Sequence, residues 1–379
     1  MTLPADGAGL RVVHLDTGKE LRGGQRQLML LAGALRERGY EQLLVCPEDS
    51  ALEGWAHSEG FRLLTLPRHD PGHLHGITLL RRELETARFD IFHAHDGRSQ
   101  TVSTLASLGF GAKRVATRRV TFLPRGLGEA LQFHRLQYGR TCDAIIAVSG
   151  FVRDLLVRSG LETSKIEVIP DGVEIPAQLP DAAFLASIRR QWELEPDAFV
   201  IGHAGAFTRE KGQDLLLEAF IEAGTSLPAR SRLLLVGEGS LHDSIGSLVA
   251  NTRGRAVMLR PMEDLTPFFA ALDLYVMPSR SEGLGSSALL AMAHCVPVVA
   301  SRVGGLPEIV EDGTNGWLVD PESPAALAQA LISAASDPDR LRSLGLAARD
   351  RACAFSSDIM VNRTETLYHR LVSAGRVSS

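Results

Sequence analysis

Short apolar runs alternate with amphipathic segments along nearly the whole chain of 379 residues. Uninterrupted apolar runs bounded by polar or glycine-rich turns are typical of strands buried on both faces of a parallel sheet. Between them, residues 25–38 place Leu28, Leu31 and Leu35 on one helical face and end before Gly39. The pattern predicts strands over residues 10–15, 42–46, 61–66, 91–94, 114–117, 144–148 and 166–169, and then over 199–204, 232–236, 256–259, 274–277, 297–301 and 316–319.

The order strand, helix, strand, helix recurs in both halves of the chain, which predicts an α/β fold with parallel sheets. Pro170-Asp171-Gly172 ends the last strand of the first half, and residues 176–180 are polar and rich in proline. A chain of this length also favours two domains over a single core. We therefore expect two doubly wound, Rossmann-like domains that face each other across a cleft, one over residues 1–172 and one over 173–354.

Composition places the chain among well-packed soluble proteins, with 45% hydrophobic and 22% charged residues. No apolar run is long enough to cross a membrane, and the N-terminus lacks a charged-then-apolar leader. The four cysteines, at positions 46, 142, 295 and 353, show neither pairing nor metal-ligand spacing. These features predict a cytoplasmic protein with reduced thiols.

Charge is unevenly distributed, although the net charge is −5. Residues 113–140 contain seven lysines and arginines, among them Arg118, Arg119 and Arg125, against the single acidic residue Glu129. Such a segment is either ordinary solvated surface or a site for an acidic acceptor or an anionic membrane surface. A nucleic-acid partner is disfavoured, because the chain is acidic overall and its basic residues are not interleaved with aromatic ones.

The segment after the strand at 274–277 carries the most informative chemical pattern. Pro278 and Ser279 break the strand, Glu282 begins a Glu-Gly-Leu-Gly turn, and Ser286 opens a helix of small residues as its expected N-cap. A helix N-terminus presents free backbone N–H groups that bind phosphate, and Glu282 adds an acceptor for hydroxyl groups. This combination suits the diphosphate and the sugar of a nucleotide sugar.

Further glycine turns follow other strands, at the sheet edge where doubly wound folds bind ligands. The turn from Gly205 to Gly212 lacks the Gly-Lys-Ser/Thr ending of a nucleotide triphosphatase loop, but it places Lys211 near a helix start, where an ammonium group can neutralise a diphosphate. Similar turns are found at Gly23-Gly24, Gly237-Glu-Gly239 and Gly304-Gly305. A row of such turns indicates a ligand site rather than a series of plain loops.

His93, His95 and Asp96 close the fourth strand at the same kind of edge. The two histidines share one face of the strand, because alternate residues do. We expect one ring to pack in the core and the other to line the site. Two histidines at this spacing can suggest a metal, but no third ligand has suitable spacing, so no metal site is predicted.

Several of these segments together resemble the family 4 retaining glycosyltransferases, which have the GT-B architecture. The similarity spans residues 22–27 (Arg-Gly-Gly-Gln-Arg-Gln), 147–149, 168–173 (Val-Ile-Pro-Asp-Gly-Val), 211–212, 235–239, 278–283 and 298–308. The resemblance implies a nucleotide-diphosphate sugar donor, a glycan or lipid-linked acceptor, and no metal ion or cofactor. It also implies that the last helix, within residues 355–379, packs back on the first domain.

Site residues follow from the turns and from this resemblance. Lys211, Glu282 and Arg119 are expected to be catalytic, and His95, Asp96, Arg118 and Arg125 are expected on the acceptor side. The expected donor-binding residues are Gly23, Gly24, Gly205, Arg209, Gly237, Gly283, Leu284, Gly285, Ser286 and Leu290.

Three positions depart from the family pattern. Ala206 replaces the usual arginine of the donor loop, and Arg119 replaces the usual active-site histidine. Leu290 stands where the family has a second glutamate, and a leucine cannot accept hydrogen bonds from ribose hydroxyls.

The expected function is retaining transfer of a sugar to a glycan or lipid-linked acceptor in bacterial cell-surface polysaccharide or lipopolysaccharide synthesis, at the inner face of the membrane. Two alternatives stay open. A catalytically degenerate GT-B binding protein would fit Ala206 and Leu290, and would show no donor hydrolysis. A sugar-nucleotide epimerase would release sugar without an acceptor, and a phosphorylase would need a pyridoxal-binding lysine.

Overall fold

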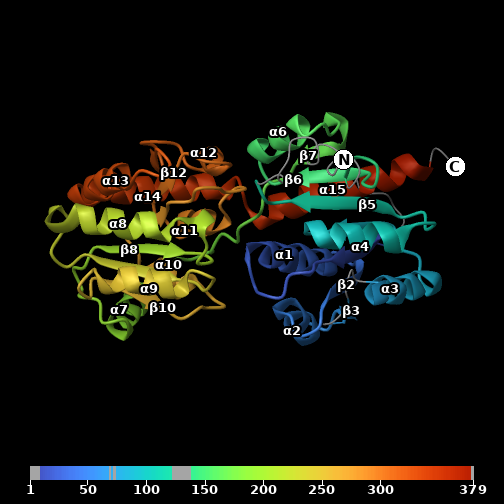
Figure 1. Ribbon diagram of the computed structural model, residues 1–379, viewed down its shortest axis with the longest axis horizontal. Coiled ribbons are helices and arrows are strands. Elements are labelled where there is room, and N and C mark those ends of the chain that lie inside the picture. The colour runs from blue at the N-terminus through green and yellow to red at the C-terminus, as the bar shows by residue number, and fades with distance from the viewer. Residues whose placement is uncertain (1–8, 68–69, 71–73, 122–137, 377–379) are drawn as a thin grey trace. The chain divides into compact units, whose positions relative to one another are not determined.

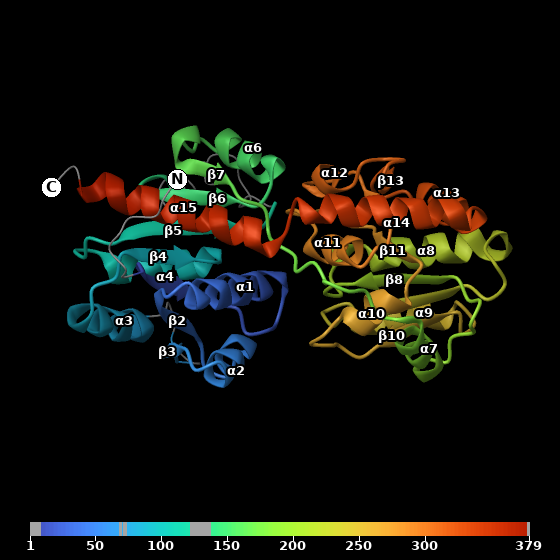
Figure 2. The ribbon, with the colours of Figure 1, turned by 180° about the vertical axis from the view of Figure 1, so that it is seen from behind.

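Two compact units make up the chain, one of residues 1–172 with 357–379 and one of residues 173–356. The structure is a computed structural model that describes residues 9–67, 70, 74–121 and 138–376. Each unit is built on a parallel sheet with helices on both faces (Figures 1 and 2). The predicted fold class of two Rossmann-like, parallel-sheet units is confirmed.

In the N-terminal unit, seven strands of the described residues form one parallel sheet. They are β1 (Arg11–Leu15), β2 (Glu41–Pro47), β3 (Arg62–Leu66), β4 (Ile91–Ala94), β5 (Lys113–Arg118), β6 (Ala144–Ala147) and β7 (Ile166–Val168). Their order across the sheet is β3-β2-β1-β4-β5-β6-β7. The chain therefore reverses direction across the sheet between the neighbours β1 and β4, which is where doubly wound folds bind ligands.

Alternate residues of these strands serve two cores. Val12 packs with Leu367 and Tyr368 on the face covered by α1 (Gly23–Glu37) and α15 (Ser357–Arg376). Val13 and Phe92 pack on the other face, covered by α3 (Leu74–Thr86) and α4 (Gly97–Ser107). Figure 2 shows α15, in red, lying along the sheet of this unit. The helices are α1 (Gly23–Glu37), α2 (Ala51–Ser58), α3 (Leu74–Thr86), α4 (Gly97–Ser107), α6 (Gly150–Arg158) and α15 (Ser357–Arg376).

In the C-terminal unit, the described strands are β8 (Val200–Ala204), β9 (Arg232–Val236), β10 (Ala256–Leu259), β11 (Leu274–Met277), β12 (Val298–Ser301) and β13 (Gly316–Val319). Their order is β10-β9-β8-β11-β12-β13, so the reversal falls between β8 and β11. The helices are α7 (Ala182–Gln191), α8 (Gln213–Ala223), α9 (His242–Ala250), α10 (Thr266–Ala271), α11 (Ser286–Ala293), α12 (Leu306–Ile309), α13 (Pro324–Ser336) and α14 (Pro338–Cys353).

The expected N-cap of α11 is wrong by one residue. Ser286 is the first residue of the helix, and the N-cap is Gly285, with φ at 106° and no side-chain hydrogen bond to the first turn. A left-handed φ is accessible to glycine at little cost, so the strand-to-helix turn ends on a residue without a side chain. No capping side chain therefore competes for the backbone N–H groups at this end.

Among the described residues, no helix combines the length and the apolar composition that crossing a lipid bilayer requires.

Candidate functional site

Lys211 and Glu282 meet at the reversal point of the C-terminal sheet. Lys211 ends a short 3-10 turn, η4 (Arg209–Lys211), after β8, and Glu282 lies in the loop after the neighbouring strand β11. Lys211 Nζ donates to Glu282 Oε2 at 2.6 Å, and both side chains are largely buried. Ser279 Oγ lies 3.4 Å from the same carboxylate oxygen. Two predicted catalytic residues are thus in direct contact.

Two glycines allow the loops around this pair to approach closely. Gly212 has φ at 68°, and a Cβ there would lie 2.2 Å from the Pro278 carbonyl oxygen. Gly304 has φ at 56°, and a Cβ there would lie 1.8 Å from the carbonyl oxygen of Glu282. Side chains at these positions would push the backbone segments apart, so glycine sets the spacing of the loop that carries Glu282.

Gln213, the first residue of α8, fixes the turn that begins at Gly205. Its amide nitrogen donates to the Ala206 carbonyl oxygen at 2.9 Å and lies 3.1 Å from His203 Nε2. His203 Nδ1 lies 2.9 Å from the Val276 carbonyl oxygen, and burial lowers the pKa of His203 to about 4. Because this imidazole stays neutral, its Nε2 can accept the Gln213 amide proton while Nδ1–H donates to β11.

The start of α11 presents its backbone rather than its side chains. Gly283, Leu284 and Gly285 are buried, and the Leu284 side chain is only 2% exposed, so only main-chain groups of these residues can face a ligand. Ser287 Oγ is bound by the buried hydroxyl of Tyr275 at 2.9 Å, which leaves Ser286 as the half-buried hydroxyl of the first turn. An uncapped helix N-terminus of this kind suits an anionic oxygen.

The other predicted donor-side residues lie around this centre. Gly205 and Gly237 touch, since a Cβ on Gly237 would lie 2.0 Å from the Gly205 carbonyl oxygen. The Arg209 side chain is exposed. Leu290 is half-buried, one helical turn after Ser286 on the same face of α11.

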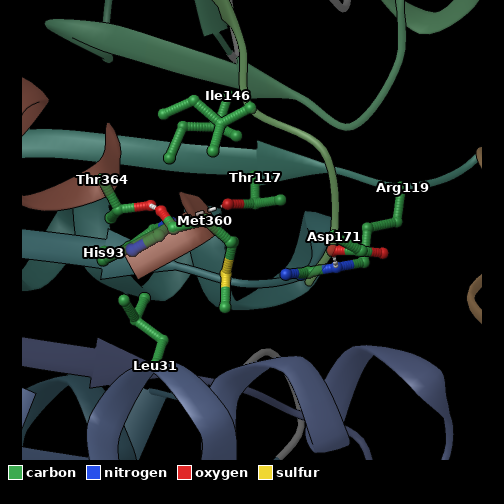
Figure 3. Close-up of a pocket in the computed structure, with 9 residues that line it drawn as sticks. Leu31, His93, Thr117, Arg119, Ile146, Asp171, Met360 and Thr364 are labelled. Atoms are coloured by element: carbon green, nitrogen blue, oxygen red, sulfur yellow. Dashed lines mark hydrogen bonds and ion pairs between the residues drawn. The ribbon is translucent and has the colours of Figure 1, made fainter. Parts of the chain in front are cut away.

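In the N-terminal unit, Arg119 is held by two partners. Its Nε donates to Asp171 Oδ1 at 2.9 Å, and Nη1 donates to the His95 carbonyl oxygen at 3.4 Å. A Cβ on Gly24 would lie 3.8 Å from Arg119 Cδ, so Gly24 is its neighbour from the first turn of α1. Gly23 begins that helix. Figure 3 shows Arg119 and Asp171 pointing toward each other. Both residues line a cavity of about 10 Å³, the size of one water molecule.

Three buried histidines gather beside this ion pair, which reasoning from spacing alone did not foresee. His14 comes from β1, and its Nδ1 lies 3.1 Å from His95 Nε2. His93 shares a hydrogen bond with Tyr368 Oη at 2.5 Å through Nδ1 and another with Thr117 Oγ1 at 2.7 Å through Nε2. His14 is therefore the third histidine that the spacing of His93 and His95 did not reveal. Both ring nitrogens of His93 are hydrogen-bonded to hydroxyl groups, so we interpret the cluster as a hydrogen-bonded network rather than a metal site.

We expected one of the rings of His93 and His95 to pack in the core and the other to line the site. This expectation is wrong, because both residues are buried, at 1% and 4% exposure. Burial is also the main cause that lowers the pKa of His93 and His95 well below 6.5. Neighbouring imidazoles and Arg119 act in the same direction. These histidines are neutral at physiological pH.

The remaining acceptor-side residues have structural partners of their own. Asp96 is the N-cap of α4, and it accepts from the Ser99 and Thr17 backbone N–H groups at 2.9 and 2.6 Å. Arg118 is buried beside Tyr138, with which it shares a hydrogen bond. Arg125 lies outside the described residues.

Asp16 is a polar residue of this edge that the sequence reasoning missed. It directly follows β1, is 1% exposed, and accepts from Gly18 N–H and from Gln25 Nε2, both at 2.7 Å. Burial first, and then the charge of Asp96, raise its pKa to about 6. An acidic residue at the end of the first strand of a doubly wound sheet was the available signal.

Comparison with known proteins identifies the family of this chain. Residues 21–175 match the domain described as glycosyltransferase family 4, and residues 198–337 match the domain described as glycosyl transferases group 1. Together these domains take in most of the chain. The protein belongs to the family 4, group 1 glycosyltransferases and is a glycosyltransferase.

Individual relatives show the same kinship. The chain is 31% identical to the D-inositol 3-phosphate glycosyltransferase of Pseudarthrobacter chlorophenolicus, over 76% of this chain and 73% of the relative. It is 30% identical to a GDP-mannose-dependent alpha-(1-6)-phosphatidylinositol monomannoside mannosyltransferase of Mycolicibacterium smegmatis, over 65% and 68% of the two chains. Among solved structures, Anabaena HepE in complex with UDP-glucose matches with a TM-score of 0.84 at 21% identity, over 94% of this chain and 99% of that one.

Proposed function

We propose that the protein transfers a sugar, with retention of configuration, from a nucleotide-diphosphate donor to a glycan or lipid-linked acceptor. The contact between Lys211 and Glu282 at the reversal point of the C-terminal sheet carries this proposal. It unites a cation suited to a diphosphate with a carboxylate suited to sugar hydroxyls, beside the uncapped start of α11. The names of the relatives support the donor class, since one is described as GDP-mannose-dependent.

In this proposal, donor binding breaks the ion pair between Lys211 and Glu282. A bound diphosphate takes over the Lys211 ammonium, and Glu282 is released to accept from hydroxyl groups of the sugar. The developing negative charge of the leaving diphosphate is met by Lys211, by the exposed Arg209 and by backbone N–H groups at the start of α11. Preformed cationic and N–H groups can meet this charge without a divalent cation.

The acceptor belongs to the N-terminal unit in this proposal, beside Asp96 and Arg119, which follow β4 and β5. His95, Arg118 and Arg125 stay predicted acceptor-side residues, and Arg125 lies outside the described residues. The names of two relatives contain phosphorylated compounds, D-inositol 3-phosphate and phosphatidylinositol monomannoside, which favours an anionic acceptor here. Arg119 is paired with Asp171 and donates to the His95 carbonyl oxygen, so we expect it to hold the backbone at His95 in place. We also expect its positive charge to attract an anionic acceptor.

This acceptor class fits bacterial cell-surface polysaccharide or lipopolysaccharide synthesis. The protein would act in the cytoplasm, with peripheral contact to an anionic membrane surface.

The test is a screen of thermal stabilisation by UDP, GDP, UDP-glucose and GDP-mannose, followed by a transfer assay with the best donor. A ligand at a hundred times its dissociation constant adds about 2.7 kcal/mol to the free energy of unfolding, which a melting curve resolves. Uridine and guanosine are the matched controls, because they lack the diphosphate and should stabilise far less. Failure of every diphosphate to bind would refute the proposal, and binding without hydrolysis or transfer would favour the degenerate binding protein.

A further inference from the structure

Arg280 joins the two loops that carry the proposed donor-site charges. Its guanidinium donates to both carboxylate oxygens of Asp214, at 2.8 Å each, and its Nη1 also donates to the Arg209 carbonyl oxygen at 3.0 Å. The Arg280 backbone N–H donates to the Glu210 carbonyl oxygen at 2.7 Å. One residue of the loop after β11 is thus bound to η4 and to the first turn of α8 at the same time.

The position of these bonds along the chain matters. Arg209 and Glu210 immediately precede Lys211, and Asp214 follows it on the next helix, so the bonds bracket Lys211 on both sides. On the other loop, Arg280 lies two residues before Glu282. The separation of Lys211 Nζ from Glu282 Oε2 therefore depends on backbones that Arg280 ties together.

The bond to Asp214 is of a kind that only arginine makes. The planar guanidinium matches both oxygens of a carboxylate at once, which fixes direction as well as distance. The Arg280 side chain is only 18% exposed, and its hydrogen bond is the main cause that lowers the pKa of Asp214. Glu322 Oε1 accepts from Arg280 Nε at 3.0 Å. Asp214 and Glu322 therefore pair with Arg280, while Glu282 pairs with Lys211.

We propose that Arg280 is a positioning residue of the donor site, which holds the turn bearing Lys211 against the loop bearing Glu282 while a donor separates the two side chains. The inference rests on the proposed function, because it assigns Lys211 and Glu282 to the donor. Arg280 touches no reacting atom in this role, and acts through Lys211.

The first test compares Arg280→Lys with the matched control Arg230→Lys. Arg230 pairs with Asp197 on the surface of the same unit, with both side chains more than half exposed. Arg280→Lys keeps the positive charge but loses the paired hydrogen bonds to both oxygens of Asp214. We therefore expect kcat to fall about tenfold or more while the melting temperature stays close to wild type. Asp214→Asn should behave like Arg280→Lys, and Arg230→Lys should change neither quantity. A wild-type kcat in Arg280→Lys, or a loss of kcat matched by a large loss of melting temperature, overturns the proposal.

A double mutant separates positioning through Lys211 from an independent effect. If Arg280 acts through Lys211, then Arg280→Lys adds little to the loss already caused by Lys211→Ala, whereas independent effects multiply. Multiplying losses overturn the proposal.

A crystal structure of ligand-free Arg280→Lys tests the inference without any activity. The η4 turn should shift and the contact between Lys211 and Glu282 should lengthen. An unchanged contact overturns the inference even where the enzyme proves active. A longer contact between Lys211 and Glu282 in Arg280→Lys supports the positioning role of Arg280. If the wild-type protein also binds no nucleoside diphosphate, only the proposed function is refuted.

Discussion

At the scale of single residues, a substitution at Leu290 tests whether the start of α11 faces a nucleotide. It is half-buried, whereas its neighbour Leu289 is completely buried. A glutamate at position 290 can therefore stay hydrated in the free protein and reach a ribose held at the helix start. A charge-assisted hydrogen bond nets about 1.5–3 kcal/mol, so Leu290→Glu should tighten binding of UDP or GDP about tenfold or more.

Calorimetric titration and a melting curve on Leu290→Glu check this expectation, with Leu289→Glu as the control. The control buries an unpaired carboxylate and should lower the melting temperature strongly. Tighter nucleotide binding at an unchanged melting temperature supports the donor site. A collapse of Leu290→Glu that resembles the control, without any gain in binding, would show that the donor pocket lies elsewhere.

Residues of the site differ in how far the sequence could reveal them. Lys211 and Glu282 were predicted because each follows a strand end within a glycine turn, and strand ends of a parallel sheet share one edge. Their direct contact depends on β8 and β11 being neighbours, which local pattern does not encode. Arg280 and Asp214 were missed for the same reason, because a pairing 66 positions apart leaves no local signal.

At the scale of elements, strand positions were predicted closely and helix starts were not. Strands such as β4 (Ile91–Ala94) and β11 (Leu274–Met277) are buried on both faces, and an uninterrupted apolar run marks such a strand directly. The start of α11 was misplaced because Ser286 is a good capping residue in isolation, whereas the turn requires the left-handed φ of Gly285. Helix α1 begins at Gly23, two residues before the apolar helical pattern over residues 25–38.

Helix α15 is joined to the sheet of the N-terminal unit by a polar bond as well as by apolar packing. Tyr368 is fully buried, and its hydroxyl is bound to His93 Nδ1 at 2.5 Å. Tyr368→Phe removes that partner and leaves a buried ring nitrogen unsatisfied, which should cost about 1–3 kcal/mol. The melting temperature of the N-terminal unit should fall by several degrees, while Thr366→Ala on the exposed face of the same helix should leave it nearly unchanged. Equal melting temperatures for the two variants would contradict the contribution assigned to this bond.

At the scale of the whole molecule, the two units differ in how many buried neutral histidines they hold. The N-terminal unit contains His14, His93 and His95, and burial lowers the pKa of His14 to about 3 and those of the other two well below 6.5. In the described part of the C-terminal unit, His203 is the fully buried histidine, with a pKa of about 4. In an unfolded chain each imidazole titrates near pH 6.5.

The sign of the resulting pH dependence follows from linkage. Below about pH 6.5 the unfolded chain binds protons that the folded units exclude, so each such histidine lowers the free energy of unfolding by about 1.4 kcal/mol per pH unit. Asp16 opposes this trend, because its folded pKa of about 6 lies above the usual 3.8, and the folded unit keeps a proton that the unfolded chain has released. In the C-terminal unit burial also lowers the pKa of His294, and burial raises the pKa of Asp273, which acts in the opposite direction. Three fully buried histidines against one carboxyl therefore leave the N-terminal unit more sensitive to acid than the C-terminal unit.

Between pH 6.5 and 4.5 the melting temperature of the N-terminal unit should therefore fall more steeply than that of the C-terminal unit. Scanning calorimetry across this range, with hydrogen exchange to assign each transition to its unit, measures the two slopes. His14→Asn should reduce the slope of the N-terminal unit, because one proton-excluding site is removed, whereas the exposed His57→Asn should not. The slope is the decisive quantity, since His14→Asn can also change the melting temperature at pH 7. Equal slopes in the two units, or a slope that His14→Asn leaves unchanged, would contradict the assignment of acid sensitivity to the buried cluster.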